Sequence, residues 1–153
     1  VPIETETTSC PLHQELMLQA ESQKDKSSDW WRHVAALLCT KQGEQVFGFN
    51  EHMPSPHSPY INGDVRANLD AGQLPEMGTA IHGEVSAITE AARTGAKTLN
   101  ATLYVTTFPC HNCARAIVKA GITTVYFKEG YSSLDAKEIL DEAGVKLVKV
   151  LFN

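Results

Sequence analysis

Two short stretches, IHGEV at residues 81–85 and TFPCHNC at residues 107–113, decide how this chain is interpreted. They contain one histidine and a Cys-x-x-Cys pair, and each opens a segment with the apolar periodicity of a helix. An imidazole and two thiolates are ligands that zinc prefers in proteins. The spacing therefore predicts a zinc site assembled from the beginnings of two helices, with His82, Cys110 and Cys113 as its ligands.

The number of ligands indicates the kind of zinc site. Structural zinc is usually closed by four protein ligands, whereas catalytic zinc keeps its fourth tetrahedral position for water. Three ligands therefore favour chemistry at the metal, where the pKa of water falls from about 15.7 towards roughly 7. A nearby group must then move the proton, and Glu84, two residues after the histidine, is the candidate general acid/base.

Each part of this pattern also has a simpler interpretation. A Cys-x-x-Cys pair alone is typical of a redox pair or of half a structural zinc knuckle. The combination is more specific, because Pro109 directly precedes the first cysteine and apolar helical runs follow both parts. A redox pair and a degenerate structural site remain the alternatives to catalytic zinc.

Length and charge limit what can surround such a site. The 153 residues fit one domain with a sizeable core. The chain carries 13 Lys and Arg against 18 Asp and Glu, so it offers no general electrostatic attraction to nucleic acid. This balance favours a small substrate held in a local pocket.

The cysteine count favours a reducing, cytoplasmic location. Two of the four cysteines are assigned to zinc, and Cys10 and Cys39 are interpreted as small apolar side chains. A zinc-thiolate protein with so few cysteines is more typical of a reducing compartment than of a secreted protein held together by disulfides. We find no signal-peptide pattern and no apolar run near the roughly 20 residues of a membrane span, so no membrane partner is expected.

Hydrophobic periodicity predicts helices alternating with strands. Gly95 and Gly121 should end the middle two helices, and a turn at 41–44 should join the first two strands as a hairpin. Residues two apart on an ideal helix point about 200° apart, so His82 is expected in an irregular entry turn. The expected helices lie at 10–23, 80–94, 110–120 and 132–143, and the strands at 34–39, 45–49, 99–107, 123–127 and 145–151.

Residues 50–78 break this pattern, because four of the seven prolines fall here among polar residues. Structureless stretches of this length are uncommon inside a compact domain and tend to be lids or binding loops. A disordered insertion is the alternative. His52 and His57 lie in this stretch without a cysteine partner and are interpreted as solvated loop residues.

From about Trp30 to Val150 the chain resembles the cytidine/deoxycytidylate deaminase superfamily, and most closely its deoxycytidylate (dCMP) deaminase branch. The run YVTTFPCHNCA at 104–114, continued by Ile117 and by AGI at 120–122, is similar to that branch's YVT-x-FPC-x-x-CA…I…AGI. The branch's H-A-E-x-N-A-I motif appears as HGEVSAI at 82–88, with Gly for Ala and Ser for Asn. The resemblance implies the same roles for the zinc ligands and the glutamate.

The fold implied by this resemblance is of the α/β class, a three-layer α/β/α cytidine-deaminase-like fold with a five-stranded mixed sheet. Nucleoside cytidine deaminases typically join strands four and five by a tight hairpin, whereas a helix at 132–143 intervenes here. A helical crossover requires strands four and five to be parallel. Residues 1–153 are interpreted as one zinc-dependent deaminase domain, with an N-terminal helix and linker at 1–29 and the long loop at 50–78.

The resemblance also implies hydrolytic deamination of a cytosine ring at C4, with Zn²⁺ and without an organic cofactor. It assigns Asn50 to the sugar, the Gly83 backbone N–H to the base and Phe108 to the pocket wall. For the substrate's phosphate we select Arg66 of the long loop, because the planar guanidinium suits phosphate oxygens. The alternatives are core packing for Phe108, a strand end for Asn50 and a surface ion pair for Arg66.

Three functions follow from these observations. The first is deamination of a free cytosine nucleotide, dCMP to dUMP plus ammonia, by a homo-oligomer. The second is deamination of another nucleoside, base or single-stranded polynucleotide, although the sequence shows no Lys/Arg cluster for a polynucleotide groove. The third is a non-catalytic zinc-stabilised binding protein, whose expected feature, loss of the catalytic glutamate, is not found.

Overall fold

A computed structural model describes residues 6–26, 34–53, 80–130 and 134–152, with helices on both faces of a mixed sheet. The helices are α1 (Pro11–Glu21), α3 (Gly83–Thr94), α4 (His111–Ala120) and α5 (Leu134–Glu142), with a short 3₁₀ helix at Lys24–Lys26. The strands are β1 (Glu6–Thr8), β2 (Ala35–Cys39), β3 (Gln45–Phe49), β4 (Glu51–His52), β5 (Ala80–Ile81), β6 (Thr102–Thr107), β7 (Thr124–Glu129) and β8 (Lys146–Val150).

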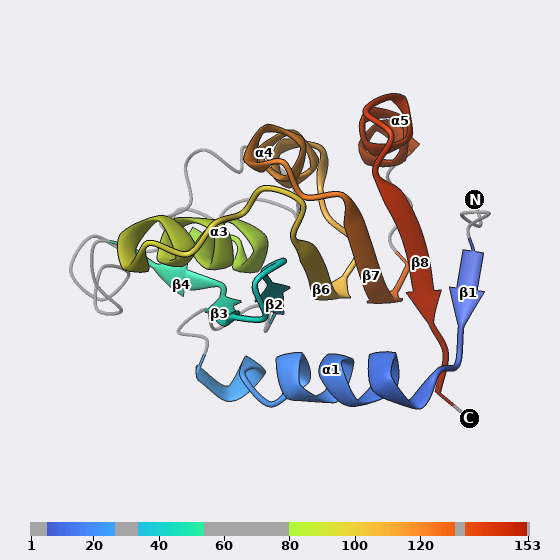
Figure 1. The fold of residues 1–153 in the computed structure, drawn as a ribbon, viewed down its shortest axis with the longest axis horizontal. Helices are drawn as coiled ribbons and strands as arrows, with labels where there is room; N and C mark the ends of the chain where they lie inside the picture. Colours follow the sequence, from blue (N-terminus) through green and yellow to red (C-terminus); the bar gives the residue numbers. More distant parts are fainter. Residues whose placement is uncertain (1–5, 27–33, 54–79, 131–133, 153) are drawn as a thin grey trace, which may run out of the picture.

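The central sheet has six strands in the order β1-β8-β7-β6-β2-β3. The strand β2 is antiparallel to both β3 and β6, whereas the pairs β6–β7, β7–β8 and β1–β8 are parallel. Figure 1 shows α1 on one side of this sheet and α3, α4 and α5 on the other. The three-layer α/β/α fold, the first hairpin and the parallel pairing of the last two strands are therefore confirmed.

The expected count of five strands is wrong, because β1 adds a sixth strand at the edge of the sheet. It pairs parallel with β8, and Glu6 lies opposite Val148. Three residues are too few to show the alternation by which a strand is recognised in a sequence. Pairing with β8 over a long sequence separation is what makes this segment extended.

A separate two-stranded sheet, formed by β4 and β5, joins the two ends of the stretch predicted as a long loop. Glu51 pairs antiparallel with Ile81, and His52 pairs with Ala80. Helix α3 therefore begins at Gly83 and not near residue 80, because Ala80 and Ile81 belong to β5. The residues between the two ends, 54–79, lie outside the described part of the chain.

Apolar side chains form one core on each face of the sheet. On the α1 side, Met17 and Ala20 pack with Leu37, Tyr104 and Val150, all of them buried. The larger core lies under α3, α4 and α5, and its largest fully buried side chains include Leu103, Val105, Ile117, Val125, Phe127 and Leu140. Within the described residues, no helix has both the length and the apolar character needed to cross a membrane.

Helix α3 comes closest to the sheet at Gly48 of β3. A Cβ atom on Gly48 would lie 2.2 Å from the backbone nitrogen of Ala87 and 2.5 Å from the carbonyl oxygen of Gly83. Both distances are far below a van der Waals contact, and both partners are backbone atoms. Gly48 thus provides the space that lets the first turn of α3 reach the sheet.

Gly48→Ala is therefore expected to lower the free energy of unfolding by about 1–3 kcal/mol, because an extra carbon in a filled space forces the backbone to move. The matched control is Gly130→Ala, since a Cβ atom on Gly130 would meet nothing within 4 Å. Denaturant titrations of both variants measure the difference. Equal stability of the two variants would show that α3 does not need this close approach.

Candidate active site

His82 lies at the junction between β5 and α3. Its backbone is extended, with φ −78° and ψ 154°, and it occupies the N-cap position before Gly83. The pairing of β5 with β4 ends at Ile81, so the chain turns into the helix at this histidine. The structure therefore has His82 in an entry turn, as expected from its separation from Glu84.

The two cysteines lie at the start of α4, just beyond the carboxyl end of β6. Cys110 is the N-cap residue, and its Sγ accepts a hydrogen bond from the backbone N–H of Cys113 at 3.5 Å. Cys113 is in the first turn and is 1% exposed. Both sulfur atoms therefore lie at the amino end of a helix, where the helix dipole favours negative charge.

The three candidate ligands converge although they come from separate elements. The Nδ1 atom of His82 lies 3.1 Å from the Sγ of Cys113 and 3.5 Å from the Sγ of Cys110. All three ligand atoms lie within 4.8 Å of one another. Tetrahedral zinc, with bonds of about 2.0 Å to nitrogen and 2.3 Å to sulfur, separates the two atom types by about 3.5 Å. The donor types and their spacing fit a zinc ion.

The side chains of Cys110 and Cys113 shift each other's pKa in opposite directions. Hydrogen bonding with the Cys113 side chain lowers the pKa of Cys110 to about 3, and the ring of His82 contributes in the same direction. The same hydrogen bond, together with burial, raises the pKa of Cys113 well above its usual value. Zinc binds cysteine as thiolate, so a bound ion would displace the proton that remains on Cys113.

Glu84 lies beside the three ligands in the first turn of α3. It is 4% exposed, and burial raises the pKa of its carboxyl group, while a hydrogen bond with the Cys113 thiol and the charge of His82 oppose the rise. In the described part of the chain, the group able to hold a metal consists of His82, Cys110 and Cys113, without Glu84. A buried carboxyl group next to such a group is well suited to proton transfer.

The family follows from a comparison with known proteins. Residues 11–129 match the family described as the cytidine and deoxycytidylate deaminase zinc-binding region. The chain belongs to this family. The match contains α1 and every residue of the metal group, so the resemblance noted in the sequence is confirmed.

Several relatives of this deaminase-family chain are similar over part of their length. It is 41% identical over 71 residues to ComE operon protein 2 of Bacillus subtilis (strain 168) and 40% identical over 72 residues to the deoxycytidylate deaminase of Enterobacteria phage T4. These matches cover 46% of this chain and only 38% and 37% of the two relatives. The cytosine deaminase of Candida albicans is 37% identical over 79 residues, which cover 51% of this chain and 53% of that protein.

A solved structure supports the same fold over nearly the whole chain. The dCMP deaminase of cyanophage S-TIM5 superposes with a TM-score of 0.69 at 23% sequence identity. The superposition covers 92% of this chain and 98% of the phage protein. At this identity the comparison establishes the architecture, and the chemistry must be argued from the residues themselves.

Three of the predicted substrate-contacting residues can be placed in this deaminase fold. Asn50 is 5% exposed at the end of β3 and accepts a hydrogen bond from the Val34 backbone N–H. Gly83 is buried at the first position of α3. Phe108 is 3% exposed and packs edge-on against Phe127, with ring centroids 4.9 Å apart. Asn50 is thus at a strand end and Phe108 is in the core, as their alternative interpretations expected. The contacts of both residues with substrate stay predictions.

Two predictions about other residues differ in outcome. Cys10, interpreted as a small apolar side chain, is exposed at the N-cap of α1. Cys39 is half-buried and packs against the core on the α1 side. Arg66 and His57 lie outside the described residues, as does the side chain of His52.

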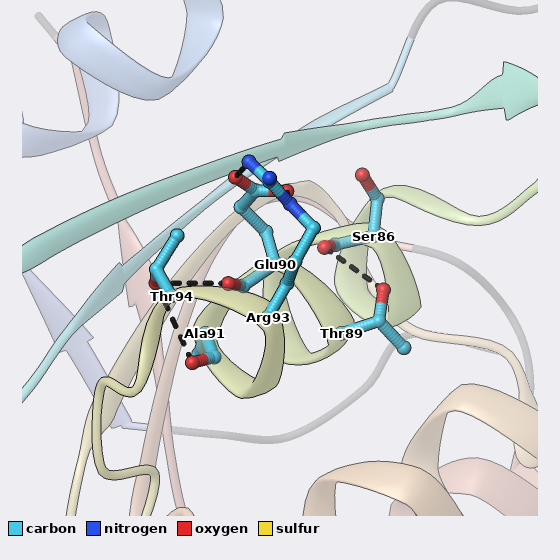
Figure 2. A network of polar contacts seen from close by, with 6 residues as sticks. All are labelled: Ser86, Thr89, Glu90, Ala91, Arg93 and Thr94. Atoms are coloured by element: carbon cyan, nitrogen blue, oxygen red, sulfur yellow. Dashed lines mark hydrogen bonds and ion pairs between the residues drawn. The ribbon is translucent and has the colours of Figure 1, made fainter.

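Arg93, an exposed residue near the end of α3, is paired with a carboxylate of the same helix. Figure 2 shows Arg93 donating to Glu90, with an Nε to Oε2 distance of 3.0 Å. In the same view, Thr89 donates its hydroxyl proton to the backbone carbonyl of Ser86, and Thr94 donates its own to that of Glu90, both one turn earlier in the helix. Arg93 is therefore engaged within its own helix.

Sequence reasoning missed two residues that set the position of α3. Gly48 provides the space under the helix, and Val34 lies close to Gly83, since a Cβ atom on Gly83 would lie 3.3 Å from the Val34 carbonyl oxygen. A glycine inside a strand is a known sign of close backbone approach, so Gly48 could have been found. Nothing in the local sequence marks Val34, since its role depends on a contact with a distant segment.

Proposed function

We propose that this chain catalyses zinc-dependent hydrolytic deamination of a free cytosine nucleotide, with dCMP as its substrate. In this reaction dCMP and water give dUMP and ammonia. The observation that carries the proposal is the convergence of His82, Cys110 and Cys113 beside the buried carboxyl group of Glu84. The choice of a nucleotide is supported by the phage deoxycytidylate deaminases among the relatives and by the S-TIM5 enzyme, whose structure includes dCMP and dUMP.

His82 would hold the zinc ion through Nδ1, and Cys110 and Cys113 through their sulfur atoms. The ion, when bound, supplies a Lewis acid that makes water a nucleophile near neutral pH. The 1% exposure of Cys113 and the 4% exposure of Glu84 keep the inner side of this site away from bulk solvent. Low solvent access strengthens the electrostatic interactions of charged groups there.

Glu84 would perform the proton transfers. Its carboxylate takes a proton from the attacking water and delivers it to N3 of the cytosine ring. The second proton of that water, on the hydroxyl group now bound to C4, then passes through Glu84 to the C4 amino group. The C4–N bond breaks, ammonia leaves, C4 keeps the oxygen as a carbonyl, and the Glu84 carboxylate is restored. The raised pKa of this buried carboxyl group favours such a cycle, because a general acid works best with a pKa close to the working pH.

A second candidate substrate is cytosine itself. It is favoured by the similarity to the Candida albicans cytosine deaminase, of which this chain covers a larger share than of the phage enzymes. The two candidates are separated by kcat/KM for ammonia release from cytosine, deoxycytidine, CMP, dCMP and a short cytosine-containing oligonucleotide. Higher kcat/KM for dCMP than for cytosine is expected, and the reverse order would replace the nucleotide proposal.

We expect Arg66 to bind the phosphate of dCMP. Arg66→Ala should then lower kcat/KM for dCMP by a factor equivalent to about 1.5–3 kcal/mol, the size of a lost hydrogen bond to a charged group, and leave deoxycytidine almost unaffected. Arg93→Ala is the matched control, because Arg93 is paired with Glu90 on the surface of α3. Equal losses on nucleotide and nucleoside would mean that Arg66 acts on the loop and does not bind phosphate.

We further propose that residues 1–153 form a single domain and that the active species is a homo-oligomer. One cooperative unfolding transition is expected for a single domain. Light scattering at micromolar concentration, beside an activity measurement, tests the assembly. A fully active monomer would contradict it.

A further inference from the structure

Both chain neighbours of His82 are held by the segment that leaves β3. Ile81, the residue before His82, pairs with Glu51 in the β4–β5 ladder. Gly83, the residue after it, lies against the carbonyl group of Val34, which is itself hydrogen-bonded to Asn50. Glu51 therefore pairs directly with the residue before this histidine, and Asn50 is linked to the residue after it through Val34.

Asn50 binds both backbone polar groups of Val34. Its side-chain Oδ1 accepts from the Val34 N–H at 2.9 Å, and its own backbone N–H donates to the Val34 carbonyl oxygen at 3.1 Å. The regular pairing of β2 with β3 ends one step earlier, at Ala35 opposite Phe49. Asn50 thus extends the hairpin by a side chain, at a site where it is 5% exposed and an unpaired N–H would be costly.

Val34 in turn supports the start of α3. A Cβ atom on Gly83 would lie 3.3 Å from the Val34 carbonyl oxygen and 3.5 Å from its carbonyl carbon, so the first helical residue lies close to this peptide group with little free space between them. The next residue of the helix is Glu84. A shift of the Val34 peptide group would therefore move the glutamate and the N-cap histidine together.

We propose that Asn50 is a positioning residue of the metal site, which fixes His82 and Glu84 by holding the Val34 peptide group under the first turn of α3. The inference rests on the proposed function for its kinetic consequences only. It differs from the sugar contact implied by the family resemblance, because the partner of Oδ1 in this role is the Val34 N–H and not the substrate. A positioning role affects every substrate equally, whereas a sugar contact affects only substrates that carry a sugar.

Two substitutions and one control test this role. Asn50→Ala removes the acceptor for the Val34 N–H, and Asn50→Asp keeps it. Thr40→Val is the matched control, because the Thr40 Oγ1 accepts from the Glu44 N–H at 2.9 Å and the residue is 6% exposed at the opposite end of the same hairpin. The Thr40→Val substitution removes a similar hydrogen bond and leaves the contacts at the start of α3 unchanged.

The first readout is independent of activity. Cobalt(II) replaces zinc in each variant, and its absorption bands report the geometry of the thiolate and imidazole ligands. We expect Asn50→Ala to shift these bands and to lower kcat by roughly 10- to 100-fold for dCMP and cytosine alike, as expected for a small misplacement of a catalytic group. Asn50→Asp should recover most of the wild-type cobalt bands and kcat. Thr40→Val should leave the bands and kcat unchanged, with a melting temperature similar to that of Asn50→Ala.

Two results would overturn the proposal. One is an unchanged cobalt spectrum in Asn50→Ala together with a loss confined to sugar-bearing substrates, which would make Asn50 a sugar-binding residue. The other is the same spectral shift in Thr40→Val, which would make it an effect of lower stability. If Asn50→Ala does not fold, the spectrum of Asn50→Asp decides, and a shifted spectrum contradicts the role. If the wild type releases no ammonia, the proposed function fails, while the spectra still test the positioning.

Discussion

Glu84→Gln is expected to keep its bound zinc and its fold while turnover falls by about 10²- to 10⁴-fold, the range typical of a lost general acid/base. The amide has nearly the shape of the carboxyl group, so the 4% exposed site remains filled, but an amide cannot take up and release the proton. Metal analysis, circular dichroism and steady-state kinetics on the same preparation measure the three properties.

Glu90→Gln is the control for this variant. Glu90 lies on the same helix, but its carboxylate pairs with Arg93 on the outer surface and lies outside the metal group. Its removal should leave turnover close to that of the wild type, since exposed ion pairs contribute little. Near-normal turnover of Glu84→Gln would remove this residue from the mechanism, and loss of zinc from the variant would assign it a role in metal binding.

Cys113→Ala is expected to lose the metal, the activity and part of the stability together. Metal that binds only the folded state stabilises it by about 2.7 kcal/mol at a concentration 100 times Kd and about 4.1 kcal/mol at 1,000 times Kd. A variant without a tight site loses this contribution, so its melting temperature should no longer depend on added zinc. Differential scanning calorimetry with and without zinc measures the change directly.

Cys39→Ala separates this effect from simple loss of packing. Cys39 is half-buried in the smaller core and lies outside the metal group. Its replacement should cost some stability yet keep the full response to zinc. Tight zinc binding and turnover in Cys113→Ala would show that this thiolate is not a ligand.

The candidate metal group could be predicted from the sequence because each of its parts is local. Apolar periodicity placed His82 and Cys110 near the beginnings of two helices, although α3 begins at Gly83 and not at residue 80, and Cys113 follows from the spacing of one helical turn. The parallel pairing of β7 with β8 could also be predicted, because the intervening helix α5 leaves no room for a hairpin. The distances between the three ligand atoms needed the structure.

The features that the sequence did not reveal depend on contacts between distant segments. The strand β1 exists through its pairing with β8, and β5 through its pairing with β4, so neither has a pattern of its own. The exposure of Cys10 could not be predicted, because helix periodicity does not define which way a residue before the first turn faces. The support of Gly83 by Val34 and Asn50 likewise joins residues that are far apart along the chain.

Zinc-dependent release of ammonia from dCMP tests the central claim most directly. The purified chain is treated with a chelator, dialysed, and assayed for ammonia and dUMP before and after addition of one equivalent of zinc. We predict no product from the metal-free protein and equal amounts of ammonia and dUMP after zinc is restored, with Glu84→Gln inactive in both states. Equal turnover with and without zinc, or zinc-loaded protein that deaminates neither dCMP nor any other cytosine compound, would contradict the account.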